Sequence, residues 1–282
     1  MTSNMVRRVA VAAVGIPAAL GLVRLGGWSL VVALSAFAAL GTVEAFRLAA
    51  ARGVRPFTAL GVAGAAAVPL LLFGLVRGTL APVWVAFGGV GWVITVMAAA
   101  VLRRPPDAGP LGAVTVTAIA PLYTGLIGFI VVFRHGAVTD PWAATWLVFL
   151  PLVSVWVCDS AAMQVGSAIG GPKFAPVVSP NKTWSGTIAG SLAATAVGPL
   201  FTVLFLRPAG LDLDLGLAAV FGFVVASLGQ IGDLAESLFK REAGVKDSGA
   251  FFPGHGGVLD RFDSLYWALP TGAALLTAFG VL

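Results

Sequence analysis

Charged side chains are scarce in this sequence of 282 residues. Only 10% of the residues are Asp, Glu, Lys or Arg and 59% are hydrophobic, whereas an ordinary soluble domain carries about 25% charged residues. This scarcity excludes a soluble globular protein. A transmembrane helix needs about 20 largely apolar residues, and the chain has room for eight or nine such helices. The sequence therefore predicts an all-α, polytopic integral membrane protein.

Cysteine is nearly absent as well. The single residue of this type, Cys158, excludes an intrachain disulfide and a thiolate metal cluster. Internal repeats, low-complexity tracts and soluble domains are also missing. The net charge of +5 would suggest a nucleic-acid partner in a soluble protein, but the excess of Lys and Arg in cytoplasmic loops of membrane proteins explains it better. We therefore expect no nucleic acid among the partners.

The apolar windows between charged or Gly/Pro breaks predict nine spans. The first one resembles a signal peptide, yet further spans follow it without a clear cleavage site, so we interpret it as a retained helix. With the N-terminus inside, 13 of the 17 basic residues fall on the cytoplasmic side, as the distribution rule for Lys and Arg requires. The predicted spans are 9–24, 27–46, 57–76, 80–102, 111–133, 142–165, 183–206, 214–232 and 262–281.

Acidic residues concentrate near the C-terminus, where six of the twelve lie within residues 233–263. Each one alone is best read as a solvated helix end. However, carboxylates are costly inside a bilayer, and Asp159, Asp233 and Asp260 are all expected at the cytoplasmic rim of their spans. Asp260 and Asp263 are predicted one helical turn apart. Such a density of oxygen ligands favours a divalent cation such as Mg²⁺, which binds a few carboxylates together with substrate phosphates.

Basic and glycine residues accompany these acids in the stretch 245–264. Lysine and arginine side chains can hold a polyphosphate, although the topological bias accounts for them equally well. The loop "FFPGHGG" gives backbone N–H groups close access to an anion. His255 in this loop has three open interpretations: a phosphate donor, a proton carrier or a loop hydrogen bonder.

A second polar cluster, "APVVSPNKTWSG", precedes the seventh span. Ser179-Pro180-Asn181 predicts a turn, and Thr183 or Ser185 is expected to cap the following helix. The plain interpretation is a turn and a cap. Together with Lys182, the exposed N–H groups of that helix start also fit an anion site.

The stretch "SLFKREAGVKDSGAFFPGHGGVLDRFD", residues 237–263, closely resembles the signature of the phosphatidate cytidylyltransferases, also called CDP-diacylglycerol synthases. The segments "QIGDLAES", "DSAAMQVGSAIG" and "SPNKTWSG" resemble the family too, so the resemblance covers about residues 155–267. Within residues 237–263 the pattern is complete, and its members are Ser237, Lys240, Arg241, Lys246, Asp247, His255, Gly256, Gly257, Asp260, Arg261 and Asp263.

The resemblance implies an enzyme that transfers CMP from CTP to phosphatidate and releases pyrophosphate. It implies a metal centre with Asp233 and Asp260 as principal ligands and Asp263 nearby, holding Mg²⁺, or Mn²⁺ in its place, beside a monovalent cation such as K⁺. Catalytic roles fall on Asp233 and on the basic, acidic and histidine members of the signature. Substrate-binding roles fall on Asp159, Ser179, Lys182, Thr183, Ser237, Gly256 and Gly257.

Three residues depart from the family pattern: Met163, where an aromatic is usual, Ser167, often basic, and Ser185, commonly Glu. We therefore assign no catalytic role to them. The organisation implied is an N-terminal set of about five spans, residues 1–140, followed by a catalytic half, residues 141–282. We expect a multi-pass protein of the cell's inner membrane with its active site facing the cytoplasm, membrane lipids around it, and a homodimer as an open option.

Two other functions stay open. A relative that acts on an isoprenoid-type lipid phosphate would share the chemistry. A membrane transporter is the alternative outside the enzymes, and it predicts acids near mid-span and broken helices, whereas here the acids gather at one rim. The D-G-x-x-A-R pattern of CDP-alcohol phosphotransferases is absent.

Overall fold

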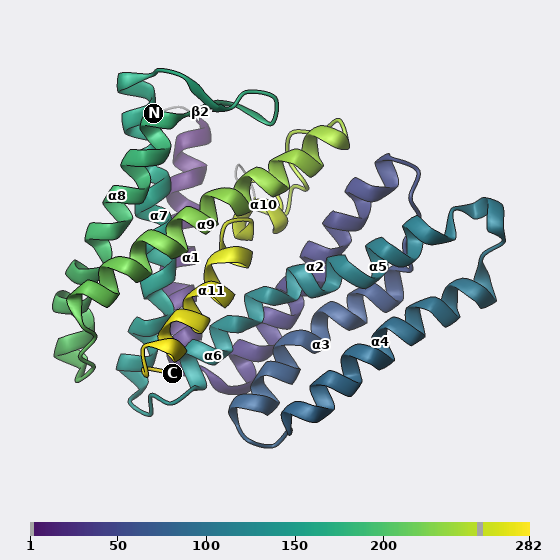
Figure 1. The fold of residues 1–282 in the computed structure, drawn as a ribbon, viewed down its shortest axis with the longest axis horizontal. Coiled ribbons are helices and arrows are strands. Elements are labelled where there is room, and N and C mark those ends of the chain that lie inside the picture. Colours follow the sequence, from purple (N-terminus) through teal and green to yellow (C-terminus); the bar gives the residue numbers. More distant parts are fainter. Residues whose placement is uncertain (1–2, 253–255) are drawn as a thin grey trace. The chain divides into compact units, whose positions relative to one another are not determined.

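The protein is described by a computed structural model covering residues 3–252 and 256–282, with side chains described at residue 13 and from residue 15 onward. His255 therefore lies outside the described residues. The chain is mostly helical, with one small hairpin of strands (Figure 1). The elements are α1 (Ser3–Leu25), α2 (Gly27–Ala51), α3 (Thr58–Val76), α4 (Pro82–Arg103), α5 (Pro110–Gly125), α6 (Phe129–His135), α7 (Pro141–Ile169), β1 (Lys173–Ala175), β2 (Ser179–Thr183), α8 (Trp184–Phe201), α9 (Leu215–Glu242), α10 (Leu259–Phe262) and α11 (Leu265–Ala278).

The long helices confirm a polytopic membrane protein. Among the described residues, seven helical stretches are long and apolar enough to cross a membrane, and they correspond to the second through eighth predicted spans. α5 and α6 form one of them, joined by a single 3₁₀ turn, Leu126–Gly128. The first predicted span, 9–24, lies within α1, of which the described part includes the apolar stretch Gly15–Leu25.

The ninth predicted span differs most from the structure. Instead of one helix over 262–281, the chain forms the four-residue α10, a turn at Asp263 and Ser264, and then the 14-residue α11. The prediction that Asp260 and Asp263 occupy one continuous helix is therefore wrong. The Asp263 carboxylate accepts a hydrogen bond from the Ser264 N–H at 2.6 Å, a local bond that competes with helix formation.

The segment before α8 also differs from the prediction. Ser179-Pro180-Asn181 belongs to β2, which pairs antiparallel with β1, and the turn lies one step earlier at residues 176–178. Thr183 ends the strand and begins the helix. Its side chain accepts a hydrogen bond from the Gly186 N–H at 3.2 Å, so the predicted cap is confirmed for Thr183.

The chain divides into two compact units. The first comprises Met1–Val131 and Phe239–Phe262, and the second comprises Val132–Leu238 and Asp263–Leu282. The boundaries pass through α6 and α9. The greater part of the signature segment therefore packs with the N-terminal helices. The sequence-based division into residues 1–140 and 141–282 instead places this segment with the C-terminal helices.

In the first unit, α2, α3, α4 and α5 lie side by side as an antiparallel set (Figure 1). Their interior is apolar, with α2 contributing Leu30, Val31 and Leu34, each no more than 4% exposed. One buried polar contact joins α2 to α5, a 2.6 Å hydrogen bond between the Thr42 and Thr124 hydroxyls. The Thr124 hydroxyl also lies 3.1 Å from the Ala120 carbonyl, so these buried hydroxyls have hydrogen-bond partners, as buried polar groups generally do.

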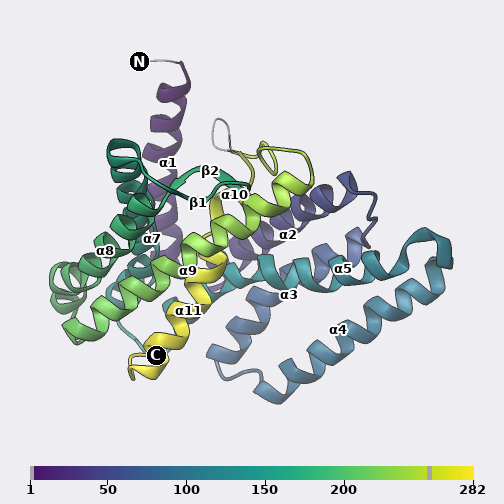
Figure 2. The ribbon, with the colours of Figure 1, turned by 45° about the horizontal axis from the view of Figure 1, so that its top comes forward.

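In the second unit, α7 and α8 pack closely, and the β1–β2 hairpin connects them (Figure 2). Gly186 and Gly190 on α8 face the backbone carbonyls of Ala162 and Cys158 on α7, where a Cβ atom would come within 2.5 and 2.7 Å. Small residues allow membrane helices to approach in this way. The resulting pair carries the hairpin and Lys182 at one end.

Candidate active site

A buried ion pair lies at the centre of the signature segment in the first unit. Lys240, in the last turn of α9, places its Nζ 2.7 Å from Oδ1 of Asp260 in α10. The two side chains are only 10% and 4% exposed. Burial by itself raises the pKa of Asp260, but hydrogen bonds from Lys240 and the Gly257 N–H, the charge of Lys240 and a bond from the Ser248 N–H outweigh it and lower that pKa below its usual range.

The other oxygen of Asp260 organises the loop between the two helices. Oδ2 accepts hydrogen bonds from the Ser248 N–H at 2.8 Å, the Ser248 hydroxyl at 2.9 Å and the Gly257 N–H at 2.8 Å. Gly256 next to it has a φ of 87° and approaches Oδ2 so closely that a Cβ atom would lie 2.8 Å away. The glycines of this loop thus make room for the Asp260 carboxylate.

This arrangement bears on the predicted metal centre. Oδ2 of Asp260 has three donors close to it, whereas Oδ1 has one, the Lys240 ammonium. Because each carboxylate oxygen has about two acceptor positions, the capacity left to Asp260 is at Oδ1, where the positive charge of Lys240 opposes a metal ion. Among the described residues, no group of three or more His, Cys, Asp or Glu side chains lies close enough to hold a metal ion.

The second unit contains the other predicted principal ligand. Asp233 on α9 pairs through Oδ2 with Nζ of Lys182 at 2.7 Å, and the two side chains are 29% and 24% exposed. Among the described residues, Oδ1 of Asp233 has one long contact, 3.4 Å, from the Ser237 hydroxyl one turn later. Asp233 therefore keeps acceptor capacity and fits a metal ion or another cation without rearrangement.

Other predicted residues are distributed over both units. In the first unit, the exposed ones are Arg241, Lys246, Asp247 and Arg261. In the second unit, Asp159 is exposed on α7, Ser179 is half-buried in β2, and Asp263 is half-buried in the turn before α11. The structure thus joins Lys240, Gly257 and Asp260 in one cluster, and Lys182, Asp233 and Ser237 in another.

Two buried residues of the first cluster were missed by the sequence analysis. Ser248 lies within the signature but is not part of its pattern, and Glu44 lies on α2, far outside the matching region. Glu44 is 4% exposed and accepts hydrogen bonds from the signature loop. A lone acid inside a predicted span is costly in a bilayer, and this signal could have identified it.

Gln230 was missed as well. It lies on α9 one turn before Asp233 and is 5% exposed. Its Nε2 donates to the Ser191 hydroxyl of α8 at 3.0 Å, and its backbone carbonyl lies 3.5 Å from Nζ of Lys182. Gln230 therefore fixes α9 against α8 beside the Lys182–Asp233 pair.

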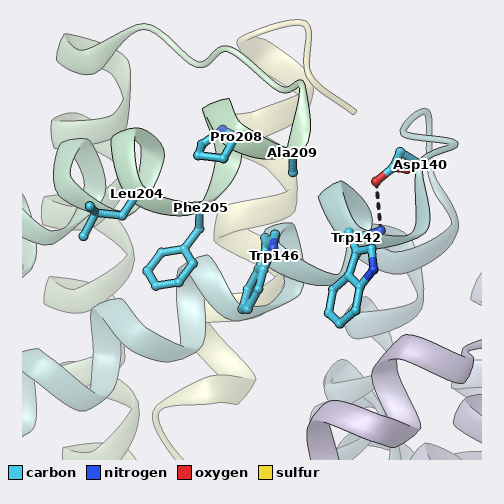
Figure 3. A pocket seen from close by; sticks show the side chains of 7 residues that line it. All are labelled: Asp140, Trp142, Trp146, Leu204, Phe205, Pro208 and Ala209. Atoms are coloured by element: carbon cyan, nitrogen blue, oxygen red, sulfur yellow. Dashed lines mark hydrogen bonds between the residues drawn. The ribbon is translucent and has the colours of Figure 1, made fainter.

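A pocket of about 470 Å³ in the second unit contains none of the predicted site residues (Figure 3). It lies where α7 begins and α8 ends, and its lining includes Trp142, Trp146 and Phe205, with Asp140 at one side (Figure 3). Because α7 and α8 are antiparallel, this is the opposite end of the pair from Lys182. Aromatic side chains at helix ends are typical of a membrane–water interface.

The chain matches the cytidylyltransferase family over residues 6–279. It is 50% identical over 143 residues to the phosphatidate cytidylyltransferase of Brucella suis, an alignment that covers 51% of this chain and 49% of that protein. It is 40% identical over 131 residues to the Haemophilus influenzae protein of the same name, covering 46% of each chain. For the Staphylococcus saprophyticus protein of that name, the identity is 43% over 125 residues, or 44% of this chain and 46% of the relative.

These alignments span about half the length of the curated relatives. The family match, in contrast, extends over almost the whole chain, including the helices before residue 140 that showed no specific motif. It also includes both clusters described above. The chain belongs to the cytidylyltransferase family.

Proposed function

We propose that this protein is a phosphatidate cytidylyltransferase, which transfers CMP from CTP to phosphatidate and forms CDP-diacylglycerol and pyrophosphate. The observation that carries the proposal is the 40–50% identity to relatives that bear this name. The buried Lys240–Asp260 pair in the signature segment supports it. Burying two charges is expensive unless they are paired and hydrogen-bonded, so this segment is built to hold a defined polar arrangement.

The reaction is a phosphoryl-type transfer. An oxygen of the phosphatidate headgroup forms a bond to the α-phosphorus of CTP, and the bond from that phosphorus to the α,β-bridging oxygen breaks. The electron pair leaves with pyrophosphate. Because phosphatidate is already an anion at neutral pH, the step needs no strong general base, and positioning and charge stabilisation supply most of the catalysis.

The burial and contacts of the basic side chains favour different roles for them. Lys240 holds Asp260, because its ammonium is buried and committed to that carboxylate. Arg241, Lys246 and Arg261 are exposed, so these cations of the signature segment are suited to bind phosphate oxygens. In the second unit, Lys182 lies directly before the capped start of α8, where a cation and backbone N–H groups favour an anion.

Metal dependence is part of the proposal. In the second unit, Asp233 would hold the ion through Oδ1, the oxygen that does not face Lys182. In the first unit, Asp260 would hold an ion only at Oδ1, beside Lys240. When bound, Mg²⁺ neutralises phosphate charge and favours the departure of pyrophosphate. Mn²⁺ as a substitute and K⁺ as a second cation are tested in the same assay, by adding each to protein stripped with EDTA and measuring CDP-diacylglycerol.

The protein is a multi-pass membrane protein, and we infer that its signature segment faces the cytoplasm of the inner membrane. The supporting observation is the concentration of 13 of the 17 basic residues on that side of the predicted topology. CTP would arrive from the cytosol, and phosphatidate from within the bilayer. Labelling of Lys246→Cys in a Cys158→Ala background, in intact cells and in inverted vesicles, tests the orientation, and crosslinking in membranes tests whether the protein forms a homodimer.

The deciding experiment uses purified protein in detergent with labelled CTP, Mg²⁺ and phosphatidate. A labelled lipid and an equal amount of pyrophosphate are expected. A parallel reaction with a polyprenyl phosphate tests the isoprenoid-type alternative, which predicts a labelled product there and none from phosphatidate. Folded protein that labels neither lipid would contradict the proposal and leave the transporter alternative.

A further inference from the structure

Glu44 is a carboxylate in a place where carboxylates are costly. It lies on α2, within a candidate membrane span, and is 4% exposed. Residues before 140 carried no functional prediction, so the sequence offers no reason for an acid there. An isolated buried carboxylate would be strongly unfavourable unless hydrogen bonds stabilise it.

The partners of Glu44 all belong to the signature loop of the same unit. Oε1 accepts a hydrogen bond from the Val258 N–H at 3.1 Å. Oε2 accepts one from the Leu259 N–H at 2.8 Å, and it lies 3.1 Å from the Ser248 hydroxyl, whose single proton it shares with Oδ2 of Asp260. Glu44 is thus bound to both ends of the loop between α9 and α10, across more than 200 residues of sequence.

Two glycines show how closely the carboxylate fits. Gly249 and Gly257 both lie against Glu44, and a Cβ atom at either position would overlap its carboxylate oxygens. Any larger residue would push Glu44 away from Ser248, Val258 and Leu259. The loop backbone is therefore shaped around this side chain.

The contact continues to the central ion pair. The Ser248 hydroxyl that approaches Glu44 also lies 2.9 Å from Oδ2 of Asp260, and Oδ1 of Asp260 binds Lys240 at 2.7 Å. The order of contacts is Glu44, Ser248, Asp260, Lys240, and all four side chains are buried. Displacement of Glu44 would remove one of the two carboxylates that hold the Ser248 hydroxyl, together with the acceptor of the Val258 and Leu259 N–H groups.

We propose that Glu44 is a positioning residue for the cytidylyl-transfer reaction, which acts through Ser248 to fix the Asp260 carboxylate and the signature loop. This inference rests on the proposed function for its kinetic consequence. The N-terminal helices then belong to the catalytic machinery, because α2 supplies the anchor.

The test uses Glu44→Gln, which keeps the size of the side chain but replaces one acceptor oxygen by an NH₂ donor. At least one of the three donors around Glu44 then loses its acceptor. The matched control is Thr42→Val. Thr42 lies two residues before Glu44 on α2, and this variant removes its buried hydrogen bond to Thr124 without changing a contact of the loop. The free-energy cost of leaving one such buried donor without an acceptor corresponds to a factor of about 10 or more in the equilibrium that holds the loop in place.

For Glu44→Gln, we expect kcat to fall about 10-fold or more, while KM for CTP stays close to that of the wild type. Thr42→Val should lose about as much thermal stability as Glu44→Gln, but its kcat should equal that of the wild type. Ser248→Ala should lower kcat as well, and its effect should not add to that of Glu44→Gln, because both act on one contact. Equal kcat for Glu44→Gln and Thr42→Val, or full additivity with Ser248→Ala, would overturn the proposal.

A second readout does not depend on the reaction. Amide hydrogen exchange of residues 245–262 should be faster in Glu44→Gln by about 10-fold or more, and unchanged in Thr42→Val. If the wild type forms no CDP-diacylglycerol, the proposed function fails, while the exchange rates still decide whether Glu44 holds the loop. Unchanged exchange in Glu44→Gln would contradict the anchor itself.

Discussion

Lys240 and Asp260 form an ion pair of 2.7 Å with both side chains almost fully buried. The pair joins the end of α9 to the start of the short helix α10. Replacing Lys240 by Met leaves the Asp260 carboxylate buried without its counterion, and such a change costs about 3–5 kcal/mol. We expect Lys240→Met to lower the unfolding temperature strongly and to abolish turnover, as measured by thermal unfolding in detergent and by CDP-diacylglycerol formation.

The double variant Lys240→Met, Asp260→Asn separates stability from activity. It removes both charges, and the amide oxygen of Asn can still accept from the Ser248 and Gly257 N–H groups that Oδ2 serves. We expect part of the unfolding temperature to return while turnover stays lost. Recovery of turnover in this variant would show that neither residue is needed for the chemistry.

Lys182 and Asp233 have the same separation, 2.7 Å, but a different environment. Their side chains are 24% and 29% exposed, so the pair contributes only about 0–1 kcal/mol to stability. We expect Lys182→Met to change the unfolding temperature little and to raise KM for CTP or lower kcat by about 10-fold, because a cation beside the start of α8 is lost. Steady-state kinetics with varied CTP measure the effect.

The control for that variant is the ion pair of Arg207 and Asp212, also 2.7 Å long and in the same unit, but 42% and 78% exposed and outside the predicted site. Arg207→Met should leave both activity and unfolding temperature unchanged. Equal kinetics in Lys182→Met and Arg207→Met would remove Lys182 from the site.

The sequence predicted the helices well because each has its own apolar composition. The seventh span was expected from residue 183, and the structure begins α8 at Trp184 with Thr183 as its cap. The break at Asp263 was not predictable from composition, because a local hydrogen bond to the Ser264 N–H decides it. The turn before β2 was misplaced for a similar reason, since strand pairing with β1 outweighed the turn preference of Ser179-Pro180-Asn181.

The candidate site shows the same distinction between local and distant information. Lys240 and Asp260 were predicted because the family pattern contains them. Glu44 and Ser248 were not, since their contact joins residues 204 positions apart, and only the packing of α2 against the loop brings them together. The motif identified the residues of the loop, but not the helix that holds it.

Gly257 is expected to be intolerant of a side chain. A Cβ atom there would overlap the carboxylate of Glu44 and lie 2.5 Å from the Ser248 hydroxyl. Overpacking of this kind costs about 1–3 kcal/mol, and here the groups that must move are those that hold Asp260. We expect Gly257→Ala to lower both the unfolding temperature and kcat.

Gly91→Ala is the matched control for Gly257→Ala. Gly91 lies in α4, and a Cβ atom there would have no neighbour within 4 Å. Alanine is favoured over glycine in a helix by about 0.5–1 kcal/mol, so this variant should keep or raise the unfolding temperature. Comparable losses in both variants would argue against a specific overlap at Gly257.

Thr183 tests whether the start of α8 matters for activity or for stability alone. Its Oγ1 accepts the hydrogen bond from the Gly186 N–H, and loss of such a cap costs about 1 kcal/mol. Thr183→Ala should therefore lower the unfolding temperature by a few degrees, and Thr183→Ser, which keeps the hydroxyl, should restore it. If the start of α8 also binds phosphate, Thr183→Ala should raise KM for CTP, because its uncapped N–H groups are held less firmly. Thr183→Ser should leave KM for CTP unchanged. A normal KM for CTP in Thr183→Ala would limit Thr183 to a structural cap and shift the substrate contact to Lys182.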